Sequence, residues 1–254
     1  MIINRSFKEF KLQHRSKKNQ IIYSSKKVQS DKEVLNLIDN FLIEKNSFIF
    51  ESVEKGKIKG RYTIFGKNPD KIWEFNNNNS FLIKNNKKVK LKEKPQILIE
   101  NIIEDFKFKI PSGLPSIASL ISGYFSYDTI RYIENIPNKC KDDLKVPDVR
   151  LLRPRILVIH DNLKKKIFYI VNIFKDEKIS NYPKKYLGIK SELSKLFTQS
   201  LKAKDKTTNE KKLAKINVKS NTSKNKFLSM VNKAKKYIKI CLLYTSDAAD
   251  DSPS

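Results

Sequence analysis

The segment RILVIHDNLKKKIFYIVNIF, residues 155–174, contains two apolar runs joined by a short polar stretch. Isoleucine and valine occur in both runs and phenylalanine and tyrosine in the second, and both runs have the length of a strand buried in a sheet. Asp161 and Asn162 open the polar stretch, and both residue types favour turns. The segment therefore predicts an antiparallel β-hairpin, which places a sheet at the centre of the fold.

The first fifty residues predict a strand followed by a helix. QIIYS, residues 20–24, is expected to be the strand. Ser30 and Glu33 are expected to form a capping box at the start of the helix. The apolar residues predicted to be buried on this helix are Val34, Leu35, Ile38, Phe41 and Leu42.

The next part of the chain predicts a second hairpin and a second helix. In DKIWEFNNNNSFLIKNN, residues 70–86, a run of asparagines separates two apolar runs, and asparagine accepts the left-handed conformations of tight turns. Pro95 is expected in the first turn of a helix, because its missing N–H costs nothing there. The apolar face predicted for that helix consists of Leu98, Ile99, Ile102, Ile103 and Phe106.

The remaining segments complete the predicted fold. A strand is expected to end near Phe125 and to run into a short helix at residues 129–135. Further helices are expected at residues 186–197 and 224–240, and the polar stretch between them is typical of a linker. Antiparallel hairpins with interspersed helices predict an α+β fold built on a largely antiparallel sheet or sandwich.

The charge of the chain is strongly positive, with 53 Lys and Arg residues against 27 Asp and Glu residues and a formal net charge of +26. A nucleic-acid-binding protein would have such a charge. However, the lysines occur in every segment, and arginine, which base recognition and bidentate phosphate contacts favour, is scarce. The codons of lysine, asparagine and isoleucine are AT-rich, so a low-GC genome is the favoured explanation, with nucleic-acid binding as the alternative.

Several classes of site have no support in the sequence. The two cysteines, Cys140 and Cys241, form neither a metal cluster nor a disulfide framework. His14 and His160 lie far apart, and His160 ends an apolar run, so it is interpreted as a strand-end residue and not as a catalyst. The glycines form no phosphate-binding loop. No apolar run is long enough to span a membrane and the first residues contain no signal-peptide core, so the cytoplasm is the expected location.

Residues 241–254, CLLYTSDAADDSPS, differ in composition from everything before them because they contain no lysine. The helix predicted before them has an apolar face and stops without a cap. Back-translation of CLLYTSDAAD can give the transposon adapter used to prepare sequencing libraries. We therefore expect these residues to be non-native and the natural chain to continue beyond Ile240.

FIFESVEKGKIKGRYTIFG, residues 48–66, has polar residues where its first apolar run ends and an arginine before its second run begins. From the residues alone, Glu51, Ser52 and Arg61 predict either a small polar pocket or an ordinary sheet surface. Spacing favours the second interpretation, in which Glu51 and Arg61 form a cross-strand ion pair that stabilises the fold by at most about 1 kcal/mol if exposed.

Three segments, in this order, resemble the component I family of anthranilate synthase, whose members are chorismate-utilising enzymes. FIFESVEKGKIKGRYTIFG is similar to the family pattern of Glu-Ser, a glycine-containing loop and Gly-Arg-Tyr-Ser, with Phe50 where leucine and Thr63 where serine is usual. SGYFSYDTIRYIENIP, followed by KDDLKVPD, is similar to a second family segment. NTSKNKFLSMVNKAKKYIKI resembles the helix that leads into the catalytic domain.

The segment GYFSYD offers no acid–base group with a defensible role. Gly123 is expected to allow close packing of two backbones. Tyr124, Phe125 and Tyr127 are expected to be core or interdomain aromatic residues.

The resemblance implies a domain organisation and an activity. Residues 1–200 would form the amino-terminal domain, residues 201–222 a linker and residues 223–240 the first helix of a truncated chorismate-binding domain. Intact members convert chorismate and ammonia to anthranilate and pyruvate, the first step of tryptophan biosynthesis, using Mg²⁺ and a glutamine amidotransferase subunit. Because the catalytic groups and Mg²⁺ ligands belong to the missing domain, this chain is expected to hold no catalytic residue and no metal site and to be inactive.

The resemblance also implies a regulatory site for L-tryptophan, a feedback inhibitor in this family. The matching positions are Phe50, Glu51, Ser52 and Arg61. Their chemistry suits a free amino acid, since Glu51 offers an acceptor for the ammonium, Ser52 a hydroxyl and an amide, and Phe50 an apolar wall for the indole. The alternative within the family is the subunit that makes aminodeoxychorismate for folate synthesis, and the motif set favours anthranilate.

Overall fold

The computed structural model describes residues 2–51, 60–137, 142–202 and 220–240. The chain divides into two compact units, Met1–Asp205 and Lys206–Ser254, which are described separately. Ser52, Cys140 and the predicted non-native segment 241–254 lie outside the described residues.

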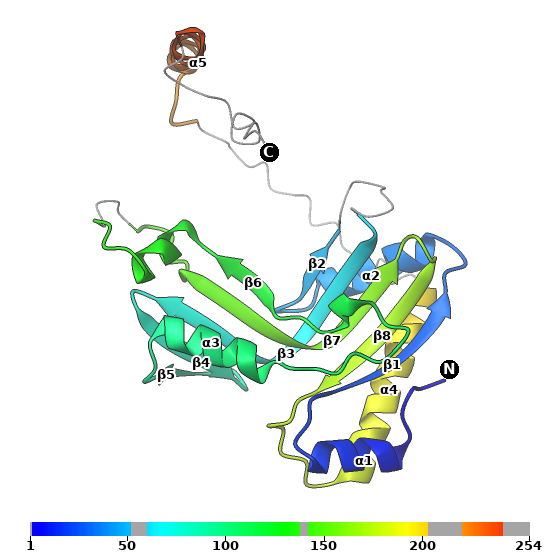
Figure 1. Ribbon diagram of the computed structural model, residues 1–254. Coiled ribbons are helices and arrows are strands. Elements are labelled where there is room, and N and C mark those ends of the chain that lie inside the picture. Colours follow the sequence, from blue (N-terminus) through cyan, green and yellow to red (C-terminus); the bar gives the residue numbers. More distant parts are fainter. Residues whose placement is uncertain (1, 52–59, 138–141, 203–219, 241–254) are drawn as a thin grey trace, which may run out of the picture. The chain divides into compact units, whose positions relative to one another are not determined.

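The first unit contains one eight-stranded antiparallel sheet with the strand order β1–β8–β7–β3–β4–β5 (Figure 1). The short strands β2 and β6 pair with β3 and β7, the two long central strands. The prediction of an α+β fold on an antiparallel sheet is confirmed. The strands are β1 Gln20–Lys27, β2 Phe48–Phe50, β3 Tyr62–Asn76, β4 Asn79–Lys84, β5 Lys87–Leu91, β6 Ser122–Phe125, β7 Val149–Asp161 and β8 Lys166–Ile173.

Helices cover the two faces of the sheet unequally. Helices α1, α2 and α4 pack on one face, where their apolar side chains form the main core with Phe65, Val158 and Tyr169. Helix α3 and the irregular segment after it cover the opposite face (Figure 1). The helices of this unit are α1 Phe7–Arg15, α2 Lys32–Leu42, α3 Pro95–Asp105 and α4 Tyr182–Leu201, with 3₁₀ helices at Ser116–Ala118 and Tyr127–Tyr132.

The second unit contains helix α5, Lys224–Lys239, which matches the predicted helix at its end. Ser223 caps it by accepting a hydrogen bond from the backbone N–H of Lys226 at 3.3 Å. Phe227, Leu228 and Ile238 are exposed on α5. Among the described residues, no helix is long and apolar enough to cross a membrane.

The hairpin of β7 and β8 confirms the prediction made from residues 155–174. Its register pairs Val158 with Tyr169 and Leu157 with Ile170. Val158 faces the core under α1, α2 and α4, whereas Leu157 faces the opposite core. Because both faces of these strands are buried, their sequences are continuously apolar and do not alternate.

The asparagine-rich hairpin is also confirmed, but its first strand is longer than predicted. Asn77 and Asn78 form the turn of β3 and β4 with φ values of 46° and 62°. β3 runs without interruption from Tyr62 through Pro69, where its register against β7 shifts. Pro69 has no N–H to donate to the ladder, and the shift accommodates it as a β-bulge.

The predicted capping box at the start of α2 is not formed. The N-cap residue is Asp31, and the Ser30 hydroxyl accepts a hydrogen bond from the backbone N–H of Lys32 at 3.3 Å. Glu33 instead directs its carboxylate to Lys26 on β1, with 2.8 Å between Oε2 and Nζ. This largely buried ion pair engages the carboxylate that a capping box would need.

The buried face of α2 also differs from the predicted one. Phe41 is buried as predicted, together with Leu37, whereas Leu35 and Leu42 are 58% and 67% exposed. The helix presents positions 33, 37 and 41 to the sheet, so Leu35 and Leu42 lie beyond the edges of that face. The predicted residues that pack partly against the core are Val34 and Ile38.

Helix α3 begins as predicted, with Pro95 in its first turn. Ile102 is buried, and Leu98 and Ile99 pack around it against the sheet. Ile103, which was predicted to be buried, is 64% exposed. The apolar face of α3 is therefore narrower than its sequence indicates.

The predicted close approach of two backbones at Gly123 is confirmed. Gly123 pairs with Leu151 in the β6–β7 ladder, and a Cβ atom on it would lie 1.9 Å from the carbonyl oxygen of Arg150. The aromatic residues that follow it are not core residues in the described unit. Tyr124, Phe125 and Tyr127 are 38%, 56% and 85% exposed.

Candidate functional site

The residues predicted to bind tryptophan lie where β2 ends and β3 begins. Phe50 is the last residue of β2, pairs with Ile64 and is 47% exposed. Its ring packs against that of Phe48, with 4.8 Å between the ring centroids. Glu51 follows directly and is exposed, and Ser52 lies outside the described residues.

Strand β2 is held close to β3 because Gly66 carries no side chain. Phe48 pairs with Gly66, and a Cβ atom on Gly66 would lie 2.2 Å from the Phe48 ring. The ring therefore lies directly over the glycine, in contact with the core on the α3 side of the sheet. This packing fixes the course of the chain up to Phe50 and Glu51.

Arg61 is held by Asp161 at the end of β7. The guanidinium donates from Nε to Oδ1 at 3.1 Å and from Nη2 to Oδ2 at 2.8 Å. Among the described residues, Asp161 is the carboxylate paired with Arg61, and Glu51 forms no ion pair. The cross-strand ion pair between Glu51 and Arg61 that spacing favoured is therefore wrong.

Asp161 is buried and accepts bonds from more than Arg61. Its Oδ1 accepts hydrogen bonds from the backbone N–H groups of Leu163 and Lys164 at 3.1 and 3.0 Å, which orders the turn into β8. Burial alone would raise the pKa of Asp161, but the bonds from Arg61 and from these backbone groups outweigh it and hold the pKa below its usual value. The carboxylate is therefore charged at neutral pH.

Sequence reasoning did not identify Asp161 as the partner of Arg61. An aspartate directly after a buried strand in a hairpin predicts a turn residue. It does not predict which arginine pairs with that aspartate. Asp161 lies opposite Tyr62 in the β3–β7 register, so the pairing depends on which strands are neighbours in the sheet.

The interpretation of His160 as a strand-end residue is confirmed. It is the penultimate residue of β7 and is 3% exposed, and neither ring nitrogen forms a hydrogen bond with a described residue. Burial, followed by the charge of Lys165, lowers the pKa of His160, while Asp161, Asp31 and Glu33 raise it by less. The imidazole is therefore neutral near pH 7.

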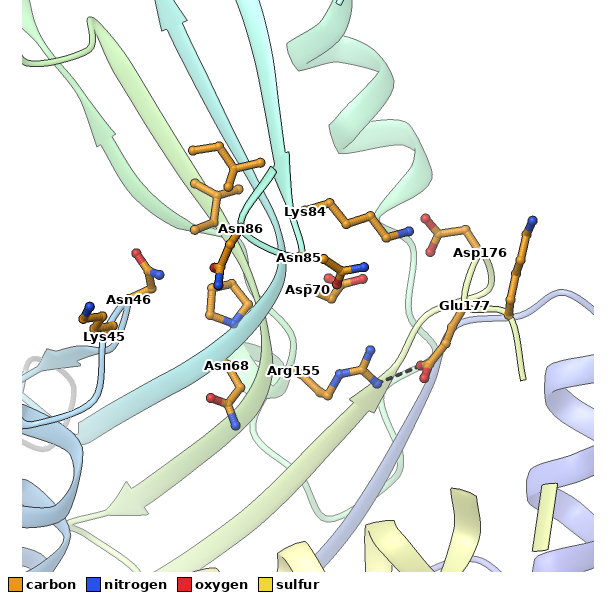
Figure 2. Close-up of a pocket in the computed structure, with 14 residues that line it drawn as sticks. Lys45, Asn46, Asn68, Asp70, Lys84, Asn85, Asn86, Arg155, Asp176 and Glu177 are labelled. Carbon is orange, nitrogen blue, oxygen red and sulfur yellow. Dashed lines mark hydrogen bonds and ion pairs between the residues drawn. The ribbon is translucent and has the colours of Figure 1, made fainter. Parts of the chain in front are cut away.

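The described residues also form a large cavity at the β3 bulge, with a volume of about 730 Å³ (Figure 2). Asn68, Pro69 and Asp70 of the bulge, the turn between β4 and β5, and the segment after β8 surround it. Ile72 and Ile83 give it an apolar floor. The remaining lining residues are Lys45, Asn46, Lys84, Asn85, Asn86, Arg155, Asp176, Glu177 and Lys178.

Nothing in the described part of the chain resembles a metal centre. No group of three or more His, Cys, Asp or Glu side chains there is placed to hold a metal ion. Asp70 and Asp176 both line the cavity, and Arg153 binds both carboxylates. Residues 2–51, 60–137, 142–202 and 220–240 therefore do not fit Mg²⁺, which hard oxygen ligands would have to bind.

Comparison with known proteins identifies relatives of this chain. The chorismate binding enzyme family matches residues 45–244. The anthranilate synthase component 1 of Acetivibrio thermocellus is 31% identical over 227 residues, which cover 86% of this chain and 45% of that protein. The anthranilate synthase component 1 of Cereibacter sphaeroides is 29% identical over 170 residues, which cover 64% of this chain and 33% of that protein.

A solved structure has the same fold. The crystal structure of anthranilate synthase component I from Streptococcus pneumoniae TIGR4 superposes with a TM-score of 0.51 and 20% identity, over 74% of this chain and 40% of that one. The chain thus spans less than half the length of the relatives it matches. Because the family match extends over most of its residues, this chain belongs to the chorismate binding enzyme family.

Proposed function

We propose that this chain is the amino-terminal, regulatory part of an anthranilate synthase component I, which converts chorismate and ammonia to anthranilate and pyruvate. The alignment with the anthranilate synthase component 1 of Acetivibrio thermocellus over 86% of the chain carries the proposal. The segments 48–66, 122–148 and 221–240 support it, because all three resemble family segments and occur in the order of the family.

The proposed regulatory ligand is L-tryptophan, bound by Phe50, Glu51, Ser52 and Arg61. Nearly half of the Phe50 side chain is exposed, which provides a surface on which an indole ring can stack. Glu51 lies beside it and would accept hydrogen bonds from the ammonium group. Arg61 uses Nε and Nη2 on Asp161, and its Nη1 forms no hydrogen bond with a described residue. This third nitrogen would donate to the ligand carboxylate.

The proposed catalysis belongs to the complete enzyme. Since the described residues do not fit Mg²⁺, they are assigned no step that involves the metal. We propose that Mg²⁺ and a glutamine amidotransferase subunit, anthranilate synthase component II, act with parts of the complete protein beyond these residues. The chain of 254 residues alone is then inactive.

The test starts from the source DNA, amplified and sequenced across codon 240. The complete natural gene is expected to restore growth of an auxotroph that lacks anthranilate synthase component I and to leave a p-aminobenzoate auxotroph unrescued. Rescue of the second strain instead would assign the protein to aminodeoxychorismate synthesis. The chain of 254 residues, purified and given chorismate, ammonium and Mg²⁺, is expected to produce no anthranilate fluorescence, and a signal would contradict the proposed inactivity.

A further inference from the structure

The cavity at the β3 bulge contains three carboxylates whose oxygens are all occupied. Asp70 accepts two hydrogen bonds from Arg153, and Asp176 accepts from Arg153 and pairs with Lys71. Glu177 pairs with Arg155 through one oxygen and with Lys185 through the other. These three carboxylates therefore neutralise positive charges of the protein itself and are not free to bind a cationic ligand.

The salt bridges are also stable to pH in the physiological range. Burial would raise the pKa of Asp176, but Lys71 and Arg153 outweigh it and hold the pKa at about 2. Arg153 is 8% exposed and lies over the ring of Phe174, with 3.9 Å from Cζ to the centroid. In this wall of the cavity, the charges of Asp70 and Asp176 are therefore balanced by those of Arg153 and Lys71.

Three lysines at the cavity have no such compensation. Among the described residues, neither a carboxylate nor a side-chain hydrogen bond engages Lys45, Lys84 or Lys178. They come from three separate elements. Figure 2 shows Lys45 and Lys84 on different sides of the cavity, with the Lys84 side chain extending toward Asp176. The uncompensated charge at the cavity is therefore positive.

Four asparagines add neutral hydrogen-bond donors around the same space. Asn46, Asn68, Asn85 and Asn86 all have left-handed backbones, with φ values between 50° and 61°. Asn46, Asn85 and Asn86 lie in turns, Asn68 lies at the bulge of β3, and each side chain ends in an amide NH₂ group. The carboxylates of the cavity are already paired, whereas the lysines and asparagines can donate hydrogen bonds. The cavity therefore suits an anion with several oxygen atoms.

From these features we propose that the cavity binds a small organic anion that carries a phosphate or a comparable multiply charged oxyanion group. The ammonium groups of Lys45, Lys84 and Lys178 and the side-chain amides of the four asparagines would bind the oxyanion. The apolar floor of Ile72 and Ile83 would contact the organic part. This site is separate from the proposed tryptophan site, and neither proposal depends on the other.

The test measures binding of phenyl phosphate and of inorganic phosphate to the chain of 254 residues by calorimetry at fixed ionic strength. Phenyl phosphate is expected to bind at a single saturable site and more tightly than inorganic phosphate, because only the former reaches the apolar floor. The triple variant Lys45→Ala, Lys84→Ala and Lys178→Ala is expected to weaken this binding by at least about tenfold. Circular dichroism checks that each variant keeps its fold.

A matched triple variant, Lys8→Ala, Lys32→Ala and Lys195→Ala, removes the same charge from exposed lysines elsewhere and is expected to change the affinity less than about twofold. A single variant avoids large charge changes: Asn85→Asp is expected to weaken binding, whereas Asn78→Asp, in the left-handed turn of β3 and β4, is not. Equal weakening by the two triple variants would show only the general attraction of the basic chain and overturn the proposal. So would the absence of saturable binding at millimolar phenyl phosphate, or a cavity that binds L-tryptophan in its place.

Discussion

Arg61 and Asp161 are joined by two parallel hydrogen bonds that connect the start of β3 to the end of β7. The same carboxylate accepts two backbone N–H groups of the β7–β8 turn. One buried side chain therefore orders a turn and also holds the guanidinium of Arg61 at the end of β7. The two bonds fix the orientation of the guanidinium, which would preorganise its Nη1 for the proposed tryptophan carboxylate.

Replacing Asp161 by asparagine is expected to lower the free energy of unfolding by about 1–2 kcal/mol, because the neutral amide loses the charge-assisted bonds and accepts through only one atom. Urea denaturation of the wild-type and variant chains measures this. The matched control is Asp142→Asn, whose partner Lys145 is 79% exposed, and which is expected to change the stability by less than about 0.5 kcal/mol.

The pH dependence of the same variant provides a second readout. The folded-state pKa of Asp161 is lowered, so its contribution to stability is present above the unfolded pKa of about 3.9 and is lost as the pH falls through the folded pKa. The difference in stability between wild type and Asp161→Asn should therefore shrink on acidification below about pH 4. A difference that stays constant down to pH 2 would contradict the assignment of the charged pair.

Two glycines with opposite surroundings test the close approach of β6 to β7. Gly123→Ala would place its Cβ atom 1.9 Å from the Arg150 carbonyl oxygen, so the strands must separate and the unfolding free energy is expected to fall by about 1–3 kcal/mol. Gly188 lies in α4, where a Cβ atom would meet nothing within 4 Å outside its own helix turn, and Gly188→Ala is expected to stabilise the chain by about 0.5–1 kcal/mol. Thermal unfolding compares the two, and equal effects would exclude backbone crowding as the cause.

Much of the fold could be predicted because its central hairpins are local in sequence. Residues 155–174 and residues 70–86 each contain paired segments of two strands and the turn between them, so composition alone identifies the pairing. The positions of Pro95 and Gly123 were predictable for a similar reason, since each is determined by backbone chemistry at one residue.

The parts that could not be predicted depend on contacts between distant segments. Glu33 was predicted to take part in a capping box but forms an ion pair with Lys26. Arg61 was predicted to pair with Glu51 but pairs with Asp161, one hundred residues away in the sequence. The sequence allows several oppositely charged partners for one charged side chain, and the order of the strands in the sheet determines which of them is adjacent. The cavity at Pro69 could not be predicted for the same reason. It is lined by the β3 bulge, the turn between β4 and β5 and the segment after β8, which are distant in the sequence.

His160 is expected to make the stability of the chain sensitive to pH below its unfolded pKa of about 6.5. Its folded-state pKa is lowered, chiefly by burial and then by Lys165, so the unfolded chain binds the proton more readily. Stability is thus complete above the unfolded pKa of about 6.5 and declines as the pH falls through it. Thermal unfolding at several pH values should show this slope in the wild type and a smaller slope in His160→Leu. Identical slopes would mean that His160 is solvated and titrates normally.

The proposed tryptophan site makes a prediction for the complete enzyme. Ser52→Phe is expected to fill the space beside Glu51 and to relieve inhibition by L-tryptophan at least about tenfold, with little change in the uninhibited rate, because no catalytic group is proposed there. The measurement is the tryptophan concentration that halves anthranilate formation. The control is Ser47→Phe, at the other end of β2, for which the same concentration is measured.

If Ser52→Phe and the control variant both retain wild-type sensitivity, tryptophan binds elsewhere and the regulatory role of this segment is wrong. If only the Ser52 variant escapes inhibition, the short polar end of β2 contains the feedback site that its Glu-Ser pattern predicts.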